Sequence, residues 1–291
     1  MLQRRAWIYG WLLVSPALVM LFAFTHYPTL ATIWNSFFST PRGRRQAAFV
    51  GLENYERLLT DDVFWQVLWN NLIYAMGTIP ASIILALGMA LWVNGKIRGR
   101  AFVRMAYFTP TVLPLIAVAN IWIFFYTPGF GLLNWLQSLL GLPSQNWLGD
   151  PDTVLYAVMV VAIWKEAGFF MIFYLAALQA IPPSLVEAGK IEGASRWYMF
   201  RRVIFPLLMP TTLFVSINAV INSFRLIDHI FVMTNGGPNN TSSLLLFYIY
   251  ETAFKFWDTA YGATLTTVML LLLCAIAIGQ FYFMDRKVHY Q

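Results

Sequence analysis

Six long apolar segments constrain this chain more than any other feature of its sequence. They cover about residues 7–27, 64–93, 102–126, 154–178, 203–233 and 260–284. A helix needs about 20 mostly apolar residues to cross a bilayer, and each segment is long enough. Backbone polar groups cannot stay unpaired in lipid, so segments of this kind form helices rather than open sheets. The sequence therefore predicts an all-α, polytopic membrane protein with six transmembrane helices.

The composition fits a membrane protein and leaves little room for a soluble domain. Of the 291 residues, 59% are hydrophobic and 11% are charged, whereas soluble domains carry about 25% charged residues. The net charge of +6 comes from basic residues in short connections between apolar segments, a pattern of membrane topology rather than of nucleic-acid binding. The one cysteine, Cys274, lies within an apolar segment. An intramolecular disulfide and a metal cluster held by thiolates are therefore excluded.

The basic residues predict how the segments are oriented. One side of the membrane would carry most of them, namely Arg4, Arg5, Lys96, Arg98, Arg100, Arg104, Lys190, Arg196, Arg201, Arg202, Arg286 and Lys287. The other side would carry Arg42, Arg44, Arg45, Arg57 and Lys255. Because the side richer in lysine and arginine faces the cytoplasm, we expect both termini to be cytoplasmic. Ala17 or Ala23 would fit a signal-peptide cleavage site, but the apolar run continues past them, so we expect the first segment to be retained as a span.

The connection between the fourth and fifth segments is the most informative polar stretch. Residues 181–206 read IPPSLVEAGKIEGASRWYMFRRVIFP. Two prolines end the preceding helix, and Ser184 with Glu187 three residues later fits a capping box. We expect a helix that begins at Ser184, a turn at Gly193 and a second helix that continues into the fifth segment.

This stretch resembles the EAA loop of ABC importer permeases. The family pattern is Glu-Ala-Ala, three residues, Gly, nine residues and Ile-x-Leu-Pro. The matching residues are Glu187-Ala188-Gly189, Gly193 and Val203-Ile204-Phe205-Pro206. The spacing agrees throughout, with Gly, Val and Phe in place of the second Ala, the Ile and the Leu of the family.

The resemblance implies a fold and a set of contacts. The fold would be that of a type I ABC importer permease, with a cytoplasmic helix-turn-helix coupling loop that docks on an ATPase. In the family, the glutamate of the motif meets a basic residue of the ATPase, and the small residues allow a close approach. The coupling residues carried over in this way are Glu187, Ala188, Gly189, Gly193 and Ala194.

Further motifs are similar to the carbohydrate-uptake branch of these permeases, which includes the maltose, lactose and glycerol-3-phosphate systems. They are Phe49-Val50-Gly51-Leu52-Glu53-Asn54-Tyr55, Arg98-Gly99-Arg100, Ala177-Leu178-Gln179, Glu192-Gly193-Ala194 and Thr234-Asn235-Gly236-Gly237-Pro238. The tail at residues 287–291 looks closest to the glycerol-3-phosphate permease. The resemblance implies a permease that imports a sugar or a glycerol-phosphate-type solute across the bacterial cytoplasmic (inner) membrane. Residues 1–63 would form an N-terminal span with an outer interfacial loop, and residues 64–291 the core permease domain.

The same resemblance implies partners that supply the energy and the solute. These are a second homologous permease subunit, two copies of an ABC ATPase, and a periplasmic or lipid-anchored solute-binding protein, all within membrane lipid and without nucleic acid. The chain itself lacks a P-loop, because Gly95-Lys96 and Gly189-Lys190 have neither the upstream Gly nor the following Ser or Thr. We therefore expect no enzyme activity, no metal and no cofactor in this chain, with ATP and magnesium held by the partner ATPase.

Polar residues in the fifth segment form the candidate solute site. Asn218, Asn222 and Arg225, together with Thr211 and His229, would share one face of a continuous helix. Polar groups at membrane depth usually face a bundle interior or a water-filled cavity, and amide and guanidinium donors suit hydroxyl-rich or phosphate-bearing solutes. The related maltose permease lines its solute site with asparagines of the corresponding helix. The alternative is that the stripe only joins helices through hydrogen bonds.

Lys165-Glu166 lies near the middle of the fourth segment. The overlapping pair Trp164-Lys165 recurs in the resembling family. We interpret Lys165-Glu166 as structural, with a contact to the solute as the alternative. An ion-coupled secondary transporter without a separate ATPase is the alternative function, and it would need intramembrane carboxylates. Glu166 and Asp228 are the candidates for them.

Overall fold

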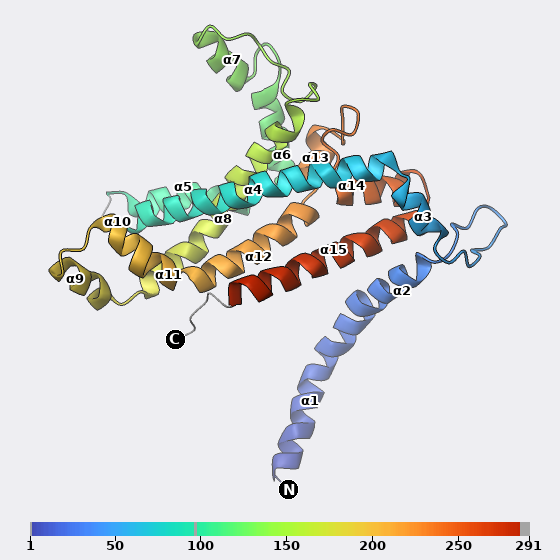
Figure 1. Cartoon of the computed structure of the whole chain (residues 1–291), viewed down its shortest axis with the longest axis horizontal. Coiled ribbons are helices and arrows are strands. Elements are labelled where there is room, and N and C mark those ends of the chain that lie inside the picture. The colour runs from blue at the N-terminus through green and yellow to red at the C-terminus, as the bar shows by residue number, and fades with distance from the viewer. Residues whose placement is uncertain (1, 96–97, 286–291) are drawn as a thin grey trace. The chain divides into compact units, whose positions relative to one another are not determined.

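The computed structural model of the chain describes residues 2–95 and 98–285. Within that part of the chain every regular element is helical, apart from two isolated bridges, Phe38 with Phe49 and Arg42 with Arg45 (Figure 1). Five helices are long and apolar enough to cross a membrane, and a bent helix pair brings the number to six. The predicted all-α membrane fold is therefore confirmed. Lys96, Arg286, Lys287 and the motif at residues 287–291 lie outside the described residues.

The chain divides into two compact units, Met1–Asp61 with Ile249–Leu272 and Asp62–Tyr248 with Leu273–Gln291. The first unit contains α1 (Leu2–Leu21), η1 (Phe22–His26), α2 (Tyr27–Asn35), α3 (Glu53–Leu59) and η3 (Glu251–Lys255). The second unit contains α4 (Asp62–Asn94), α5 (Arg100–Val112), α6 (Leu115–Tyr126), α7 (Leu132–Leu139), α8 (Val154–Ala180), α9 (Pro183–Ile191), α10 (Arg196–Met199), η2 (Phe200–Ile204), α11 (Phe205–Leu207), α12 (Met209–Arg225) and α13 (Asp228–Met233). The unit boundaries cut α14 (Leu245–Tyr250) and α15 (Thr259–Asp285). The predicted functional division after residue 63 stays a prediction.

Two prolines account for two of the π-helical turns. The turn η1 comes directly before α2, which has Pro28 in its first turn, and η2 comes directly before α11, which has Pro206 in its first turn. A proline has no backbone N–H to donate to the carbonyl four residues earlier. A single wider turn is a common adjustment where the helical hydrogen-bond ladder is interrupted in this way.

The third predicted span is not continuous. The prediction of one helix over residues 102–126 is wrong, because α5 ends at Val112 and α6 begins at Leu115 at an angle of 102° to it. Leu113 and Pro114 are both extended, with ψ near 137°. The residue before a proline is driven out of the helical region by the proline ring, so Pro114 makes Leu113 the natural breaking point.

The fifth predicted span is also interrupted. Instead of one helix over residues 203–233, α12 ends at Arg225, Leu226 is extended, and α13 begins at Asp228. His229 therefore lies on a different helix from Asn222. The single helix face predicted to carry all the polar residues from Thr211 to His229 ends with α12.

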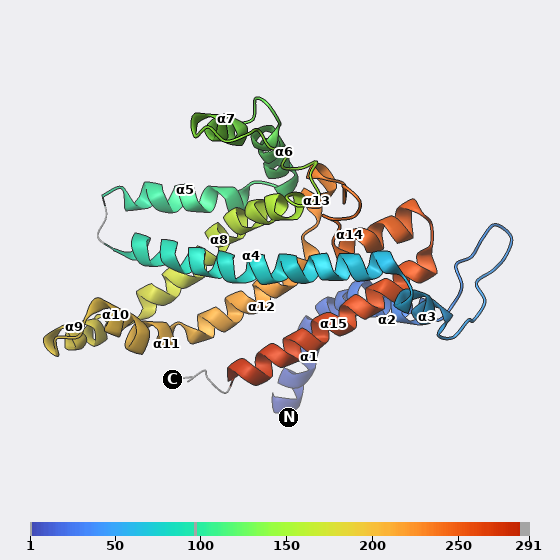
Figure 2. The same cartoon turned by 45° about the horizontal axis from the view of Figure 1, so that its top comes forward.

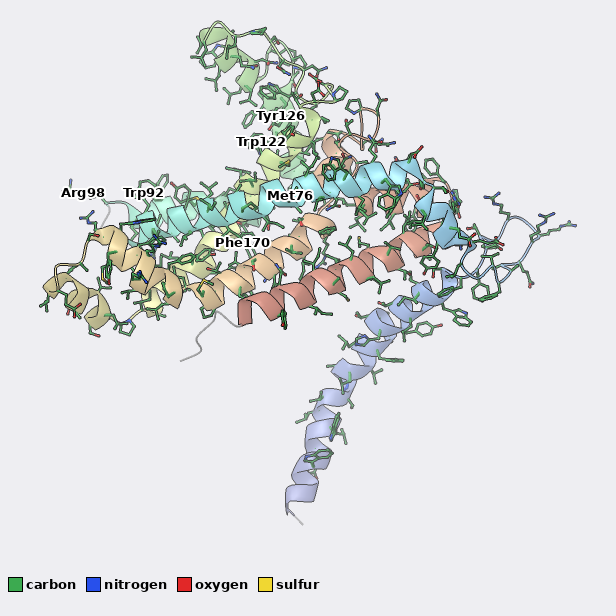
Figure 3. All side chains as sticks on the ribbon, in the orientation of Figure 1. Met76, Trp92, Arg98, Trp122, Tyr126 and Phe170 are labelled. Atoms are coloured by element: carbon green, nitrogen blue, oxygen red, sulfur yellow. The ribbon has the colours of Figure 1, made fainter. Side chains whose placement is uncertain are left out.

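The centre of the second unit is the packing of α4 against α8, which cross in both views (Figure 1, Figure 2). Ala86 and Ala90 of α4 are fully buried in one apolar cluster with Phe170 of α8, which Figure 3 labels. A Cβ added at Gly168 would lie 2.2 Å from the carbonyl oxygen of Tyr107, so α5 and α8 approach closely only because residue 168 is glycine. Small residues at such crossings are typical of helices packed in membranes.

The coupling loop folds as two short helices joined at a glycine. The predicted turn is confirmed, because Gly193 has a φ of +72° between α9 and α10. The predicted cap is wrong: α9 begins at Pro183 with Pro182 at the capping position, so Ser184 lies inside the helix. Proline is favoured at the first helical position because its φ is already set for the helix. Ser195 does cap α10, since its hydroxyl accepts a hydrogen bond of 3.2 Å from the backbone N–H of Tyr198.

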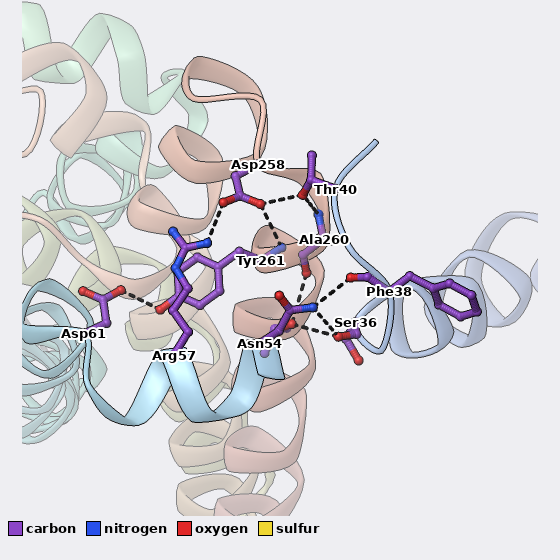
Figure 4. A network of polar contacts seen from close by, with 10 residues as sticks. Ser36, Phe38, Thr40, Asn54, Arg57, Asp61, Asp258, Ala260 and Tyr261 are labelled. Atoms are coloured by element: carbon purple, nitrogen blue, oxygen red, sulfur yellow. Dashed lines mark hydrogen bonds and ion pairs between the residues drawn. The ribbon is translucent and has the colours of Figure 1, made fainter. Parts of the chain in front are cut away.

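A polar network holds the first unit together (Figure 4). Asp258 accepts hydrogen bonds from Thr40 at 2.5 Å and from the guanidinium of Arg57 at 2.7 Å, and the guanidinium lies over the ring of Tyr261. Burial opposes the charged form of Asp258. The hydrogen bonds from Thr40 and Arg57 and the charge of Arg57 outweigh this effect and hold the pKa of Asp258 below its usual range. Arg57 lies in the short helix α3.

Candidate functional site

A small pocket lies between α4, α8 and α12 in the second unit. Its walls are formed by Tyr74, Thr78, Ile79, Ser82, Ala162, Glu166, Phe170, Ala219, Asn222, Ser223 and Leu226. The volume is about 20 Å³, which is space for roughly one water molecule. The pocket therefore has polar groups in its walls and lies beside the middle of α4 and α8 and the C-terminal part of α12.

The pocket is built around one hydrogen bond between two helices. The side-chain amide of Asn222 in α12 donates to Oε2 of Glu166 in α8 at 2.7 Å. A carboxylate has about four lone-pair sites, so Glu166 has the capacity to accept further donors.

The wall from α4 supplies hydroxyl groups. Tyr74, Thr78 and Ser82 are spaced four residues apart, so they share one face of the helix. The hydroxyl of Tyr74 is 3.0 Å from Nε2 of the fully buried His229. The hydroxyls of Thr78 and Ser82 donate to carbonyls of their own helix. None of the three hydroxyl residues was predicted for the site, although their four-residue spacing in the second apolar segment is a signal that the sequence does contain.

The three residues predicted to bind solute have different surroundings. Asn222 lines the pocket, whereas the amide of Asn218 donates back to the carbonyl of Phe214 at 2.8 Å. Arg225, the last residue of α12, is exposed and is not part of the pocket wall. Asn222 therefore lines the pocket, whereas Asn218 and Arg225 of the same helix lie outside the pocket wall.

Lys165 has a structural contact at the break in the third span. Its ammonium donates to the carbonyls of Pro110 at 3.0 Å and of Leu113 at 2.5 Å. These carbonyls lie at the C-terminal end of α5, where the helix dipole favours a cation. Lys165 therefore holds the end of α5, while its neighbour Glu166 faces the pocket.

The predicted coupling residues lie on the loop that α9 and α10 form. Glu187 and Ala188 are exposed. A Cβ at Gly189 would lie 2.2 Å from the sulfur of Met199, so the glycine in place of the family's alanine leaves room for this methionine. The loop also exposes large apolar side chains, with Ile191 87% exposed. Exposed apolar surface beside a charged group is typical of a binding surface.

Basic residues gather at one end of the second unit. The connection between α4 and α5 lies at the same end as α9 and α10, as the position of Arg98 in Figure 3 shows. Arg100 and Arg104 both face the amide of Gln179 at the end of α8; with the amide oxygen turned towards them, the distances are 3.0 and 2.7 Å. The loops rich in arginine therefore share one end of the helices, as the orientation predicted from the sequence requires.

Comparison with known proteins gives a consistent picture. The family described as "Binding-protein-dependent transport system inner membrane component" matches residues 78–290. The lactose transport system permease protein LacF of Rhizobium radiobacter is 34% identical, over 97% of this chain and 95% of the relative. The sn-glycerol-3-phosphate transport system permease protein UgpA of Pectobacterium atrosepticum is 29% identical, over 99% of this chain and 97% of the relative.

A solved structure shares the fold. A chain of the bacterial alginate ABC transporter, in complex with its alginate pentasaccharide-bound periplasmic protein, superposes with a TM-score of 0.84 at 21% identity, over 98% of this chain and 96% of that one. At this identity the likeness concerns the fold alone.

Proposed function

Because this chain belongs to the family of inner membrane components of binding-protein-dependent transport systems, it is a permease subunit of an ABC importer for a sugar or a glycerol-phosphate-type solute, and we propose that the solute passes the pocket between α4, α8 and α12. The observation that carries this proposal is the bond between Glu166 and Asn222 in the middle of the spans. Polar and charged groups are expensive at membrane depth and are kept there mainly for substrate pathways. Asn218 and Arg225 would flank the path along α12.

The coupling loop is the proposed contact with the ATPase. Glu187 and Ala188 are exposed, as a docking residue must be, and the apolar side chain of Ile191 lies beside them. ATP and magnesium would bind to two copies of a separate ATPase subunit, and this chain would have no enzyme activity. A second permease subunit would complete the solute path.

The outer face would receive the solute from a binding protein, periplasmic or lipid-anchored. The family description and the alginate transporter complex both name such a component. Both termini and the coupling loop would be cytoplasmic. The shared end of the arginine-rich loops in the second unit supports this orientation. The alternative of an ion-coupled transporter is not supported, since the family and the relatives are components of ABC importers.

The orientation is tested with cysteines in a Cys274→Ser background, which removes the one native thiol. A thiol from Lys190→Cys should resist a membrane-impermeant reagent in intact cells, and a thiol from Asn239→Cys should react. Both positions are exposed, so lack of access to the side chain itself does not interfere. The reverse pattern would contradict the orientation and the docking role of the loop.

The solute path is tested by uptake in cells that carry the complete importer. Asn222→Leu should reduce uptake about tenfold or more, because it removes the amide from the pocket wall. Asn120→Leu is the matched control: this amide also lies in a span, donates to the carbonyl four residues earlier as Asn218 does, and is absent from the pocket wall. Equal uptake by both variants, at equal membrane levels, would mean that the bond to Glu166 only joins helices.

A further inference from the structure

The pocket wall contains a single carboxyl group. Among the described residues that line it, Glu166 is the one acidic side chain, and the others are apolar or carry hydroxyl or amide groups. Asn222 donates a single amide hydrogen bond to it at 2.7 Å, which adds no charge. The walls therefore combine a carboxylate with neutral polar groups.

Lys165 and Arg225, which are neighbours of pocket residues in the sequence, do not line the pocket themselves. The ammonium of Lys165 is bound to the carbonyls of Pro110 and Leu113 at the end of α5. Arg225 is exposed at the end of α12 and does not line the pocket. A phosphate in the pocket would thus meet a carboxylate without the guanidinium or ammonium donors that usually bind phosphates.

We propose that Glu166 carries a negative charge in the pocket and determines specificity by it: this charge excludes anionic solutes, phosphate esters included, so that the imported solute is an uncharged sugar or polyol. This inference rests on the proposed solute path. Like charges in a site of low dielectric repel strongly, and a pocket lined by one sign of charge concentrates or depletes charged ligands by 10 to 10³-fold. The hydroxyls of a sugar, in contrast, are donors that a carboxylate accepts well. The similarity to a glycerol-3-phosphate permease therefore does not extend to the phosphate.

The charge of the pocket can be measured without knowing the solute. In the Cys274→Ser background, Ser223→Cys places a thiol in the pocket wall with little change in size. The assembled importer, turning over ATP, is treated with two methanethiosulfonate reagents of similar size, one carrying trimethylammonium and one carrying sulfonate. The ratio of the two reaction rates cancels the intrinsic reactivity of the thiol and reports the local potential.

Three matched variants complete the design. Glu166→Gln removes the charge and keeps an oxygen that accepts from Asn222. Ser144→Cys, on an exposed loop outside the pocket, gives the ratio without Glu166 nearby. Ser82→Cys is a second reporter in the α4 wall, in case Ser223→Cys does not assemble.

At the pocket thiol, we expect the cationic reagent to be favoured by about tenfold or more relative to the Ser144→Cys control. Glu166→Gln should remove this preference at the pocket thiol and leave the control ratio unchanged. A pocket ratio equal to the control ratio, with no effect of Glu166→Gln, would overturn the charge selection while leaving the solute path intact. If neither reagent reaches either pocket thiol during turnover, the pocket is not on an aqueous path, and the proposed solute path fails together with the inference.

Discussion

Two glutamates on neighbouring helices of the second unit have opposite surroundings. Glu166 of α8 is partly buried near the middle of a span and is bonded to Asn222 of another helix. Glu187 of α9 is exposed on the coupling loop. A carboxylate inside the membrane must find its hydrogen-bond partners within the chain, whereas an exposed one is available to another protein. The difference matches the two roles that we propose for them, selection of the solute and contact with the ATPase.

The largest effect should come from reversing the exposed charge. Glu187→Lys should reduce transport about tenfold or more and weaken co-purification of the ATPase, because truncating one side of a desolvated charge pair already costs about 2–5 kcal/mol. An acidic residue introduced at the contacting position of the ATPase should restore part of the loss. Glu192→Lys is the control, with the same change of charge on an exposed residue of the same loop. Normal transport by the Glu187→Lys variant would remove the docking role from this glutamate.

A smaller effect is expected from Lys165, the direct neighbour of Glu166. Lys165→Met keeps the length of the side chain and loses both hydrogen bonds to the end of α5. Hydrogen bonds to charged groups contribute about 1.5–3 kcal/mol, so the thermal unfolding temperature of the purified importer should fall. The preference of the pocket thiol for the cationic reagent should persist. Loss of that preference would mean that the two neighbours do not have separate roles.

The crossing of α5 and α8, which positions both side chains, gives the next test. Gly168→Ala places a Cβ against the backbone of Tyr107 and should destabilise the protein by about 1–3 kcal/mol. Gly88→Ala is the control, because its Cβ would meet nothing within 4 Å, and alanine is the better helix former. Thermal unfolding of the two variants should therefore shift in opposite directions or differ clearly. Equal shifts would contradict the close approach of the two helices.

The smallest effect concerns a third carboxylate, in the first unit. The pKa of Asp258 is lowered in the folded protein by its bonds to Thr40 and Arg57 and by the charge of Arg57. The stabilisation is therefore fully present above the ordinary pKa of about 4 and is lost as the pH falls through the lowered folded pKa. Because Arg57 is largely exposed, the effect should be about 1 kcal/mol or less. Stability measured from pH 7 to pH 3 should fall less for Asp258→Asn than for the native chain; identical pH profiles would contradict the lowered pKa.

Apolar length and motif spacing predicted the features that depend on local sequence. The membrane spans follow from hydropathy, and the coupling loop follows from its motif and from the glycine at position 193. Pro114, where the third predicted span breaks, is present in the sequence, but the break itself was not predicted. Prolines are tolerated in many membrane helices, so the proline alone did not decide between a kink and a 102° bend.

The pocket depends on contacts between helices, which a single sequence does not display. Glu166 follows a lysine, and the sequence alone favours one structural role for the pair. In the structure, the two side chains face different helices, Lys165 the end of α5 and Glu166 the side chain of Asn222 in α12. The roles of neighbours on a helix differ because their side chains point about 100° apart. Which neighbour faces the pocket is set by the crossing of α4, α8 and α12.

The number of ATP molecules hydrolysed per solute imported tests the separation of roles most directly. It is measured in proteoliposomes that hold the complete importer with its ATPase and binding protein. We predict that Asn222→Leu raises this number, because uptake falls while hydrolysis continues, and that Glu187→Lys lowers uptake and hydrolysis together and leaves the number near its native value. A native value for Asn222→Leu with a raised value for Glu187→Lys would contradict the assignment of the pocket to the solute and of the loop to the ATPase.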